Sequence, residues 1–305
     1  MHANLLDQLR IFSLIAELGS FSKAARHLDR PVSAVSYAIV TLETHLGLKL
    51  FDRAPAGRGL TDEGRTVLQD AEVILRRVAQ FDSRVRAMRE GENTDIALAV
   101  ETSFPDGLLS TGLAAFSSLY PFVSVSVTRT TAKTVGIRVA EGEGVLGVTL
   151  LDAGLQGGRL DGTQIAADVI VIVASPAHAL ARMERPIAMR DLDTHRQIHL
   201  HDGPLDRRDF DYRVHGTDVW LVDNLGEQEA FVRRGIGWAF MPRGVVGPAL
   251  AAGALVTLDC EDVRTPPLRR FAAIWRRDQA PGKIGHDLIG QLADTASAES
   301  AARPG

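Results

Sequence analysis

Apolar residues near the start of the chain recur at the spacing of short amphipathic helices. One pattern covers residues 5–18 and ends at Gly19, a residue type common just after a helix. A second pattern opens at Ser22, the predicted N-cap. A third begins at a turn that contains Pro31, and proline suits the first turn of a helix because an N–H there would have no intrahelical acceptor. Two short helices joined by so tight a turn are typical of a helix-turn-helix.

The third helix combines one apolar face with one uncharged face. Its predicted buried stripe consists of Val35, Ile39, Leu42 and Leu46. The opposite face carries small or flat residues, namely Val32, Ser33, Ser36, Tyr37 and Val40. A solvated face normally holds mixed charges, so this face is expected to pack against something. The second helix of a helix-turn-helix lies in the major groove, which makes the face a candidate DNA-reading surface; packing on another domain is the alternative.

A short apolar stretch and a Gly/Pro-rich turn follow and predict a two-stranded wing. Lys49, Arg53 and Arg58 are expected to contact phosphates or a minor groove, the alternative being a solvated basic hairpin. The predicted DNA-binding set also includes residues of the turn and of the second helix: Ser22, Arg30 and Pro31.

A long helix is predicted from Thr61, an N-cap ahead of Asp62 and Glu63. Its apolar residues alternate in steps of four and three, which defines a heptad seam: Val67, Ala71, Ile74, Val78, Phe81, Val85 and Met88. Such a seam predicts dimerisation, which would place two recognition helices on two half-sites of DNA. Packing of the helix on its own domain is the alternative.

These first residues resemble the winged helix-turn-helix of the LysR-type transcriptional regulators. The shared positions are Phe12, Gly19-Ser20-Phe21, Ala24-Ala25, Leu28, Ala34, Ser36, Ile39, Leu42-Glu43, Leu46-Gly47, Leu50-Phe51, Arg53, Leu60-Thr61 and Gly64. The resemblance implies a regulator that binds promoter DNA, responds to a small-molecule effector, forms a homodimer or homotetramer and is not an enzyme. The family usually opens the recognition helix with Ser-Gln-Pro, whereas this chain has Pro31-Val32-Ser33, so the family's preference for DNA sites does not transfer.

Predicted strands and helices alternate in the rest of the chain, as in βαβ units of a parallel sheet. The strands are expected at 96–100, 122–129 and 145–150, and the helices at 108–119 and 134–141. This part resembles the family's effector-binding half, an α/β domain of two subdomains like type 2 periplasmic binding proteins. The predicted domains are 1–61 (winged helix-turn-helix, mostly α), 62–90 (linker helix), 91–297 (effector-binding domain, with subdomain I at 95–166 and 270–297 and subdomain II at 167–269) and 298–305 (disordered tail).

In such α/β folds a ligand sits outside the carboxyl ends of the strands, between the subdomains. The residues expected there are Thr102, Ser103, Phe104, Thr128, Arg129, Thr149, His201, Asp202 and Asn224. Loop hydroxyls beside one arginine suit a small carboxylate or a similar anion. The alternative for each residue is an ordinary loop position.

Composition narrows the remaining choices. The 305 residues are 45% hydrophobic and 24% charged, as in globular proteins, with no apolar run long enough for a bilayer, so a cytoplasmic protein is expected. The net charge of −4 divides into +2 over residues 1–90 (13 Lys and Arg, 11 Asp and Glu) and −6 over the remainder (21 and 27), favouring the N-terminal part as the partner of a polyanion. Cys260 is the only cysteine, which excludes an intramolecular disulfide.

Three further patterns predict little chemistry. Residues 142–147 fit GxGxxG but lead from a helix into a strand, the reverse of a nucleotide loop. His195, His199 and His201 are a weak candidate metal cluster, and no motif fixes a nucleophile, a metal or a cofactor. Two rival functions stay open at this point: a small-molecule-binding α/β protein with a vestigial DNA-binding domain, and a DNA-binding protein without effector whose cleft is filled by Phe104, Trp238 and Phe240.

Overall fold

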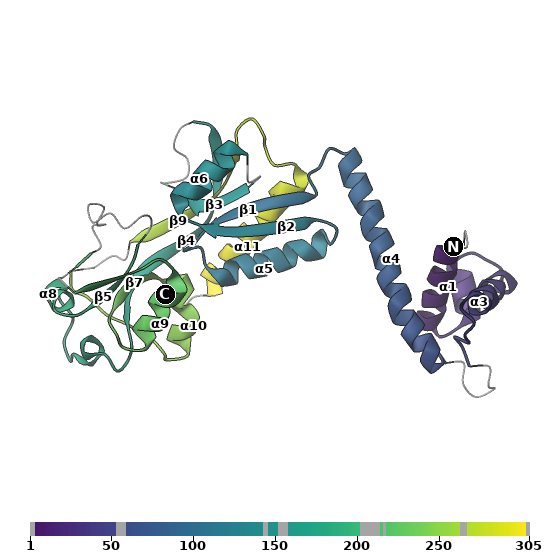
Figure 1. Cartoon of the computed structure of the whole chain (residues 1–305), viewed down its shortest axis with the longest axis horizontal. Helices are drawn as coiled ribbons and strands as arrows, with labels where there is room; N and C mark the ends of the chain where they lie inside the picture. Colours follow the sequence, from purple (N-terminus) through teal and green to yellow (C-terminus); the bar gives the residue numbers. More distant parts are fainter. Residues whose placement is uncertain are drawn as a thin grey trace. The chain divides into compact units, whose positions relative to one another are not determined.

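The computed structural model describes residues 4–52, 59–142, 146–151, 158–201, 214–215, 218–262 and 267–302. These form two compact units, Met1–Arg89 and Glu90–Gly305 (Figure 1). The first unit is helical, and the second is built around β-sheet. No helix in the described part of the chain is long and apolar enough to cross a membrane.

The N-terminal unit contains α1 (Leu5–Leu18), α2 (Phe21–His27), α3 (Val32–Leu46) and α4 (Asp62–Arg89). As predicted, α1 ends at Gly19, whose φ of 63° lies in the left-handed region that glycine tolerates. The predicted cap at Ser22 is wrong: the Ser20 hydroxyl accepts the Lys23 N–H. The earlier cap brings Phe21 into the helix, where its ring contacts Phe51 edge-on at 5.2 Å.

One core holds the short helices together. Its buried side chains come from all of them and include Leu9, Phe12, Ile15, Ala24, Ala25, Val35, Ile39 and Leu42. The prediction that Leu46 belongs to the buried stripe is wrong, because this side chain is 37% exposed. Leu46 is the last residue of α3, and the chain leaves the helix at Gly47, so the buried stripe ends at Leu42.

The segment after α3 forms the base of the predicted wing. Phe51 and Leu60 pair as an antiparallel bridge, and the Asp52 N–H donates to the Gly59 carbonyl over 2.9 Å. The described residues thus show one bridge where two strands were predicted. Arg53 and Arg58 lie outside the described residues.

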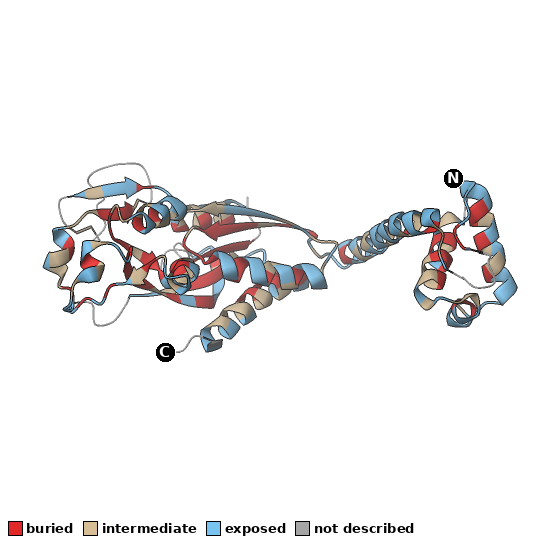
Figure 2. Cartoon of the chain, turned by 90° about the horizontal axis from the view of Figure 1, so that it is seen from below, coloured by how far each residue is buried: buried red, intermediate tan, exposed pale blue. Residues whose placement is uncertain are grey.

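The long helix α4 begins as predicted, with the Thr61 hydroxyl accepting the Gly64 N–H over 2.8 Å. A Cβ at Gly64 would lie 2.2 Å from the Leu50 carbonyl oxygen, so only glycine permits this close approach of helix and wing. Ala71 joins the core, whereas most of the following residues of α4 are exposed (Figure 2).

The second unit begins with the predicted βαβ units. Its first elements are β1 (Asp95–Glu101), α5 (Asp106–Leu119), β2 (Ser124–Thr130), α6 (Ala132–Glu141) and β3 (Leu146–Leu150). Strand β1 is parallel to β2 and to β3, which confirms the predicted parallel pairing. The parallel strands therefore end together at Glu101, Thr130 and Leu150.

Two long antiparallel strands, β4 (Leu160–Ala174) and β9 (Leu268–Arg276), connect the subdomains. In the first subdomain the strand order is β2-β1-β3-β9-β4. Farther along, β4 pairs with β7 (Ala239–Pro242) and β8 (Val256–Thr257) of the second subdomain. The chain returns to the first subdomain in β9, near residue 270, where the sequence placed the second part of subdomain I.

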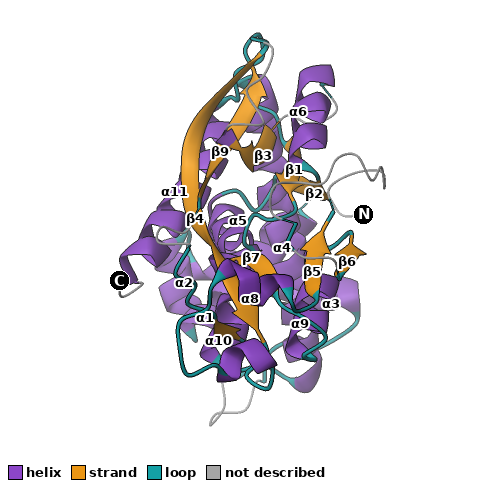
Figure 3. Ribbon diagram, turned by 90° about the vertical axis from the view of Figure 1, so that its left-hand side faces the viewer, coloured by secondary structure: helices purple, strands orange, loops and turns teal. Residues whose placement is uncertain are grey.

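The second subdomain places short helices around the β7 side of this sheet (Figure 3). Its other elements are η1 (Ala179–Arg182), α8 (Met189–Asp193), β5 (Gln197–Leu200), β6 (Val219–Val222), α9 (Leu225–Arg233) and α10 (Arg243–Ala251). β5 and β6 are parallel, and Gln197 bridges to Trp238 beside β7. Trp238 is fully buried in this subdomain's core.

The last helix, α11 (Lys283–Ala302), packs along α5 (Figure 1). A Cβ at Gly112 would lie 2.8 Å from Cδ2 of Leu292, so a glycine there permits the close helix contact. The tail predicted to be disordered from residue 298 is helical to Ala302. Alanine has the highest helix propensity, and the sequence SAESAA extends a helix already anchored by packing.

Candidate functional site

The outward face of α3 consists of the residues that the sequence singled out. Tyr37 is 74% exposed, and Val32 and Val40 are each 45% exposed. Ser33 and Pro31 are also exposed, Ser36 is half-buried, and Val35 and Ile39 lie beneath in the core. The structure therefore places a largely apolar, uncharged helix face on the surface of the N-terminal unit.

Two predicted phosphate-binding side chains take part in ion pairs of the same unit. Arg30 Nη1 lies 2.7 Å from Asp7 Oδ2, and this hydrogen bond raises the pKa of Arg30. Lys49 Nζ lies 2.8 Å from Glu43 Oε2. Both cations are exposed, so each can exchange its carboxylate for a phosphate without entering a core. Ser22 is exposed on α2.

Glu43 belongs to the positions shared with the family, but its structural contacts with the wing were not predicted. Its side chain is buried, and Oε1 accepts the N–H groups of Leu50 (2.9 Å) and Phe51 (3.5 Å). Burial acts to raise the pKa of Glu43, but the bonds from Lys49, Leu50 and Phe51 together outweigh it and lower that pKa. The carboxylate therefore fixes the base of the wing to the recognition helix. The sequence feature that indicates this position is an acid next to Leu42, the last residue of the buried stripe.

The heptad seam of α4 changes character along the helix. Ala71 is buried and Val67 packs against the N-terminal core. Farther on, Ile74, Phe81, Val85 and Met88 are between 38% and 66% exposed. The first part of the seam serves the chain's own domain, and the second part presents apolar side chains at the surface.

At the carboxyl end of β1 a buried acid organises the loop predicted to hold the effector. Glu101 is 4% exposed, and Oε2 accepts the N–H of Ser103 over 2.9 Å and also its hydroxyl. Thr102 Oγ1 lies 3.4 Å from Oε1, and Arg269 Nη2 lies 3.9 Å from it. Buried charges are normally paired, so a glutamate at the end of an apolar strand is the sequence feature that indicates such a position.

Arg129, at the end of β2, lies against the same loop. Its Nη1 donates to the carbonyls of Glu101 (3.0 Å), Thr102 (3.4 Å) and Phe104 (2.6 Å), and its Nη2 pairs with Asp106. Burial lowers the pKa of Arg129, and the nearby acids oppose that shift. The structure thus brings Arg129, Thr102 and Ser103 together, as predicted.

Other predicted effector-binding residues of the first subdomain are buried or lie on a different strand face from Arg129. Thr149 is fully buried, with its hydroxyl 3.3 Å from the Ala132 carbonyl, and Phe104 is buried edge-on against Phe271. Successive side chains of a strand point to opposite faces, so exposed Thr128 does not share the face of Arg129.

The second subdomain contributes the ends of β5 and β6. The His201 N–H donates to the Val222 carbonyl over 2.8 Å, and Asn224 caps α9 through the Glu227 N–H over 2.7 Å. Asp202 lies outside the described residues.

Asp168, Gly244 and Pro105, none of them predicted, meet where the two subdomains touch. Buried Asp168 on β4 accepts the Gly244 N–H at the start of α10 over 2.8 Å. A Cβ at Gly244 would lie 2.7 Å from Cγ of Pro105, the residue before α5. The two subdomains therefore touch where α5 and α10 begin.

The weaker motifs are spread over α6, β3 and the second subdomain. No group of three His, Cys, Asp or Glu suited to a metal occurs among the described residues. Gly142 ends α6 with a φ of 80°, and Gly147 lies in β3 against Val135 and Ile274. Trp238 and Phe240 pack edge-on at 5.3 Å in the core of the second subdomain.

A helix-turn-helix with a bare outer face, a long helix and a two-subdomain α/β unit together define a DNA-binding protein with a ligand-binding type of domain. A family model described as a bacterial regulatory helix-turn-helix protein of the lysR family matches residues 6–65, and the LysR substrate binding domain matches residues 89–297. The chain belongs to the LysR family of transcriptional regulators. It is a DNA-binding transcriptional regulator with an effector-binding domain, which confirms the predicted family, fold class and function, and the family's members are not enzymes.

Relatives and solved structures agree with this assignment. The chain is 26% identical to the uncharacterized HTH-type transcriptional regulator YeiE of Escherichia coli K12 over 284 residues, covering 89% of this chain and 90% of YeiE. It is 24% identical to the transcriptional activator AllS of Klebsiella pneumoniae, covering 82% and 93%.

Two solved structures share the fold. LysG of Corynebacterium glutamicum, solved with bound effector Arg, has a TM-score of 0.52 at 20% identity and covers 95% of this chain and 97% of its own. CrgA of Neisseria meningitidis has a TM-score of 0.53 at 22% identity and covers 97% and 99%.

Proposed function

We propose that α3 reads promoter DNA through its outward face. Ser33, Ser36 and Tyr37 supply hydroxyls for base edges and phosphates, and Val32 and Val40 supply apolar contact for thymine methyl groups. The observation that carries this proposal is the exposure of a largely apolar, charge-free helix face, with Tyr37 74% exposed. Arg30 and Lys49 beside this face bind phosphates by exchanging their carboxylate partners. A protein whose target is chromosomal DNA acts in the cytoplasm.

Selection of genomic fragments by the purified protein tests this reading. Enrichment of a few promoter regions is expected, with a double variant, Ser36→Ala and Tyr37→Ala, losing about 10-fold or more of specific affinity. Non-specific binding, which follows phosphate charge, is expected to keep its salt dependence. An unchanged set of fragments in the double variant would show that another surface reads the bases.

The exposed part of the α4 seam is proposed to form the dimer contact. Phe81, Val85 and Met88 lie at successive seam positions, and a second copy of the helix buries such a row by knobs-into-holes packing. A dimer presents two α3 helices to two half-sites. Effector binding then favours one of two dimer or tetramer arrangements and changes the spacing or bend of the bound DNA.

The effector is proposed to be a small molecule with a carboxylate, bound at the ends of β1 and β2. Arg129 supports this class because its Nη2 already holds the carboxylate of Asp106, whose side chain is 95% exposed. An effector carboxylate can displace that exposed acid while Nη1 keeps its carbonyl partners. An amino acid such as the arginine bound to LysG carries this group.

A thermal-shift screen of amino acids and carboxylic acids identifies the effector. If Asp106 competes for Arg129, Asp106→Asn should bind the same hit about 2- to 5-fold more tightly, since an exposed ion pair contributes about 1 kcal/mol or less. Asp294→Asn removes an exposed acid on α11 and serves as the matched control. Equal affinities of the two variants for the hit would show that its carboxylate does not compete with Asp106 for Arg129. If no hit changes DNA binding, regulation without an effector would be favoured.

A further inference from the structure

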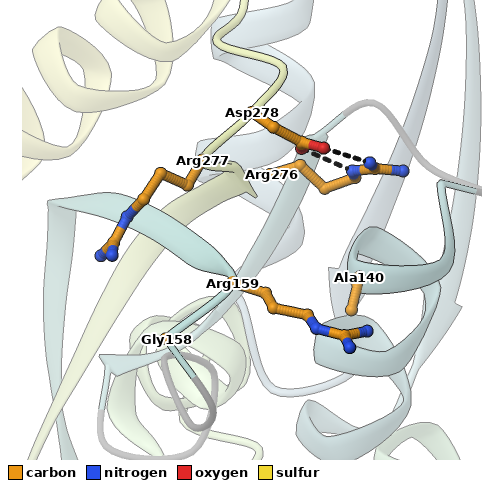
Figure 4. A pocket seen from close by; sticks show the side chains of 6 residues that line it. All are labelled: Ala140, Gly158, Arg159, Arg276, Arg277 and Asp278. Atoms are coloured by element: carbon orange, nitrogen blue, oxygen red, sulfur yellow. Dashed lines mark hydrogen bonds and ion pairs between the residues drawn. The ribbon is translucent and has the colours of Figure 1, made fainter.

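An open hollow lies at one end of the first subdomain. Its volume is about 410 Å³, and its lining residues are Ala140, Gly158, Arg159, Arg276, Arg277 and Asp278 (Figure 4). They come from the end of α6, the approach to β4 and the end of β9. A volume of this size is in the range of small-metabolite pockets.

The sheet register separates this hollow from the proposed effector site. β9 runs antiparallel to β3, and Leu150 at the end of β3 pairs with Phe271 near the start of β9. Arg276, at the far end of β9, pairs with Leu160 where β4 begins. The hollow therefore lies at the end of the sheet opposite Thr102 and Arg129.

The arginines of the hollow have different partners. Arg277 pairs with Asp161 over 2.9 Å, and its side chain points away from the other two arginines (Figure 4). Arg276 Nε lies 2.8 Å from Asp278 Oδ1. Among the described residues, Arg159 has no carboxylate partner, and its side chain extends to the same side as that of Arg276, toward Ala140.

We propose that this hollow is a second ligand site, which binds a small oxyanion through Arg159 and Arg276. A guanidinium presents parallel N–H groups that match two oxygens of a phosphate or a carboxylate. Asp278 orients Arg276 from one edge and leaves other N–H groups for the ligand. Arg159 supplies a positive charge that no described side chain of the hollow neutralises. The ligand class is a phosphate-bearing or multiply carboxylated metabolite, distinct from the effector at the strand ends.

Calorimetric titration of the full-length protein tests the site with two probes, inorganic phosphate and citrate, at an ionic strength held constant with chloride. Saturable binding of at least one probe is expected, and whichever binds more tightly distinguishes the phosphate class from the carboxylate class. Arg159→Gln should weaken it by about 10-fold or more, because a bidentate charge-assisted contact is lost. Arg277→Gln removes the same charge from a side chain that points away, and should change the affinity by about twofold or less.

A gain-of-affinity variant completes the design. Asp278→Asn removes the one acid among the described residues that line the hollow and should strengthen anion binding. All of these side chains lie at strand ends rather than in a core, so the variants are expected to stay folded, which circular dichroism checks. The absence of saturable binding of both probes, or equal weakening by Arg159→Gln and Arg277→Gln, would overturn the proposal.

Discussion

Glu43 shows how one buried side chain sets the shape of the DNA-binding unit. Its carboxylate accepts two backbone N–H groups at the start of the wing and pairs with Lys49 at its rim. A buried donor left without an acceptor costs about 1–3 kcal/mol. The wing therefore holds its place beside α3 through a polar contact rather than through apolar packing alone.

Replacing Glu43 by alanine is expected to lower the free energy of unfolding of the N-terminal unit by about 2–3 kcal/mol, since two N–H groups lose their acceptor. Lys49→Ala removes only the exposed half of the ion pair and should cost less than about 1 kcal/mol. Urea unfolding followed by far-ultraviolet circular dichroism measures both changes. Similar losses in the two variants would show that the ion pair, and not the backbone contact, stabilises the wing.

His178 makes the stability of the second subdomain depend on pH. Its Nδ1 accepts the Leu180 N–H over 3.3 Å and caps η1, which requires an unprotonated nitrogen. Burial, and then the neighbouring His195, lower the pKa of His178 below its ordinary 6.5. The folded protein thus favours neutral His178. The contribution of this cap to the free energy of unfolding is therefore complete above pH 6.5 and is lost as the pH falls through and below that value.

His178→Asn keeps a capping acceptor but carries no titrating group, so it should lose less stability than the wild type between pH 7 and pH 5.5. The difference is expected to be about 1 kcal/mol or less, the value of one cap. The tryptophans, at 220, 238 and 275, all lie in the second unit, so their fluorescence follows its unfolding. His27→Asn, on α2, is the control and should leave the pH dependence of the wild type unchanged.

At the scale of elements, the periodicity of apolar residues predicted the helices and strands whose bounds depend on local sequence. The bounds of α1, the Thr61 cap and the parallel strands β1 to β3 were all predictable, because each depends on spacing and caps within one segment. The extension of α11 and the long pairing of β4 with β9 depend on distant partners. Sequence likewise grouped Thr102, Ser103 and Arg129. It missed Glu101 and Asp168, because the partners of these buried acids include Arg269 and Gly244, which lie far along the chain.

The helix α4 carries the next prediction. Phe81→Asp places a charge in the exposed part of the seam and should raise the dimer dissociation constant about 100-fold or more, since a symmetric interface contains the change twice. Val73→Asp is the matched control, because Val73 is 49% exposed on the same helix but off the seam. Sedimentation equilibrium distinguishes the two. A dimer that survives Phe81→Asp would assign assembly to the effector-binding unit.

The whole molecule joins two units that have different tasks and opposite net charge. Residues 1–89 carry the helix proposed to read DNA and the exposed seam, and residues 90–305 carry both proposed ligand sites. Neither unit contains everything that regulation needs, because an effector changes DNA binding only through a difference in its affinity for two states of the whole assembly. Regulation is therefore a property of the intact chain.

Separating the units should separate binding from response. Residues 1–89 alone are expected to bind promoter DNA with the salt dependence of phosphate contacts, and to be indifferent to any hit of the thermal-shift screen. In the intact chain the same hit should change DNA affinity by about 5- to 150-fold, or alter the footprint length, the usual range of coupling between sites. Residues 90–305 alone should retain the affinity for the hit. Footprinting measures the DNA binding, and calorimetry measures the affinity for the hit. If the hit still changes the DNA affinity of residues 1–89 alone, the effector site would lie in the DNA-binding unit and not beside Arg129 and Asp106.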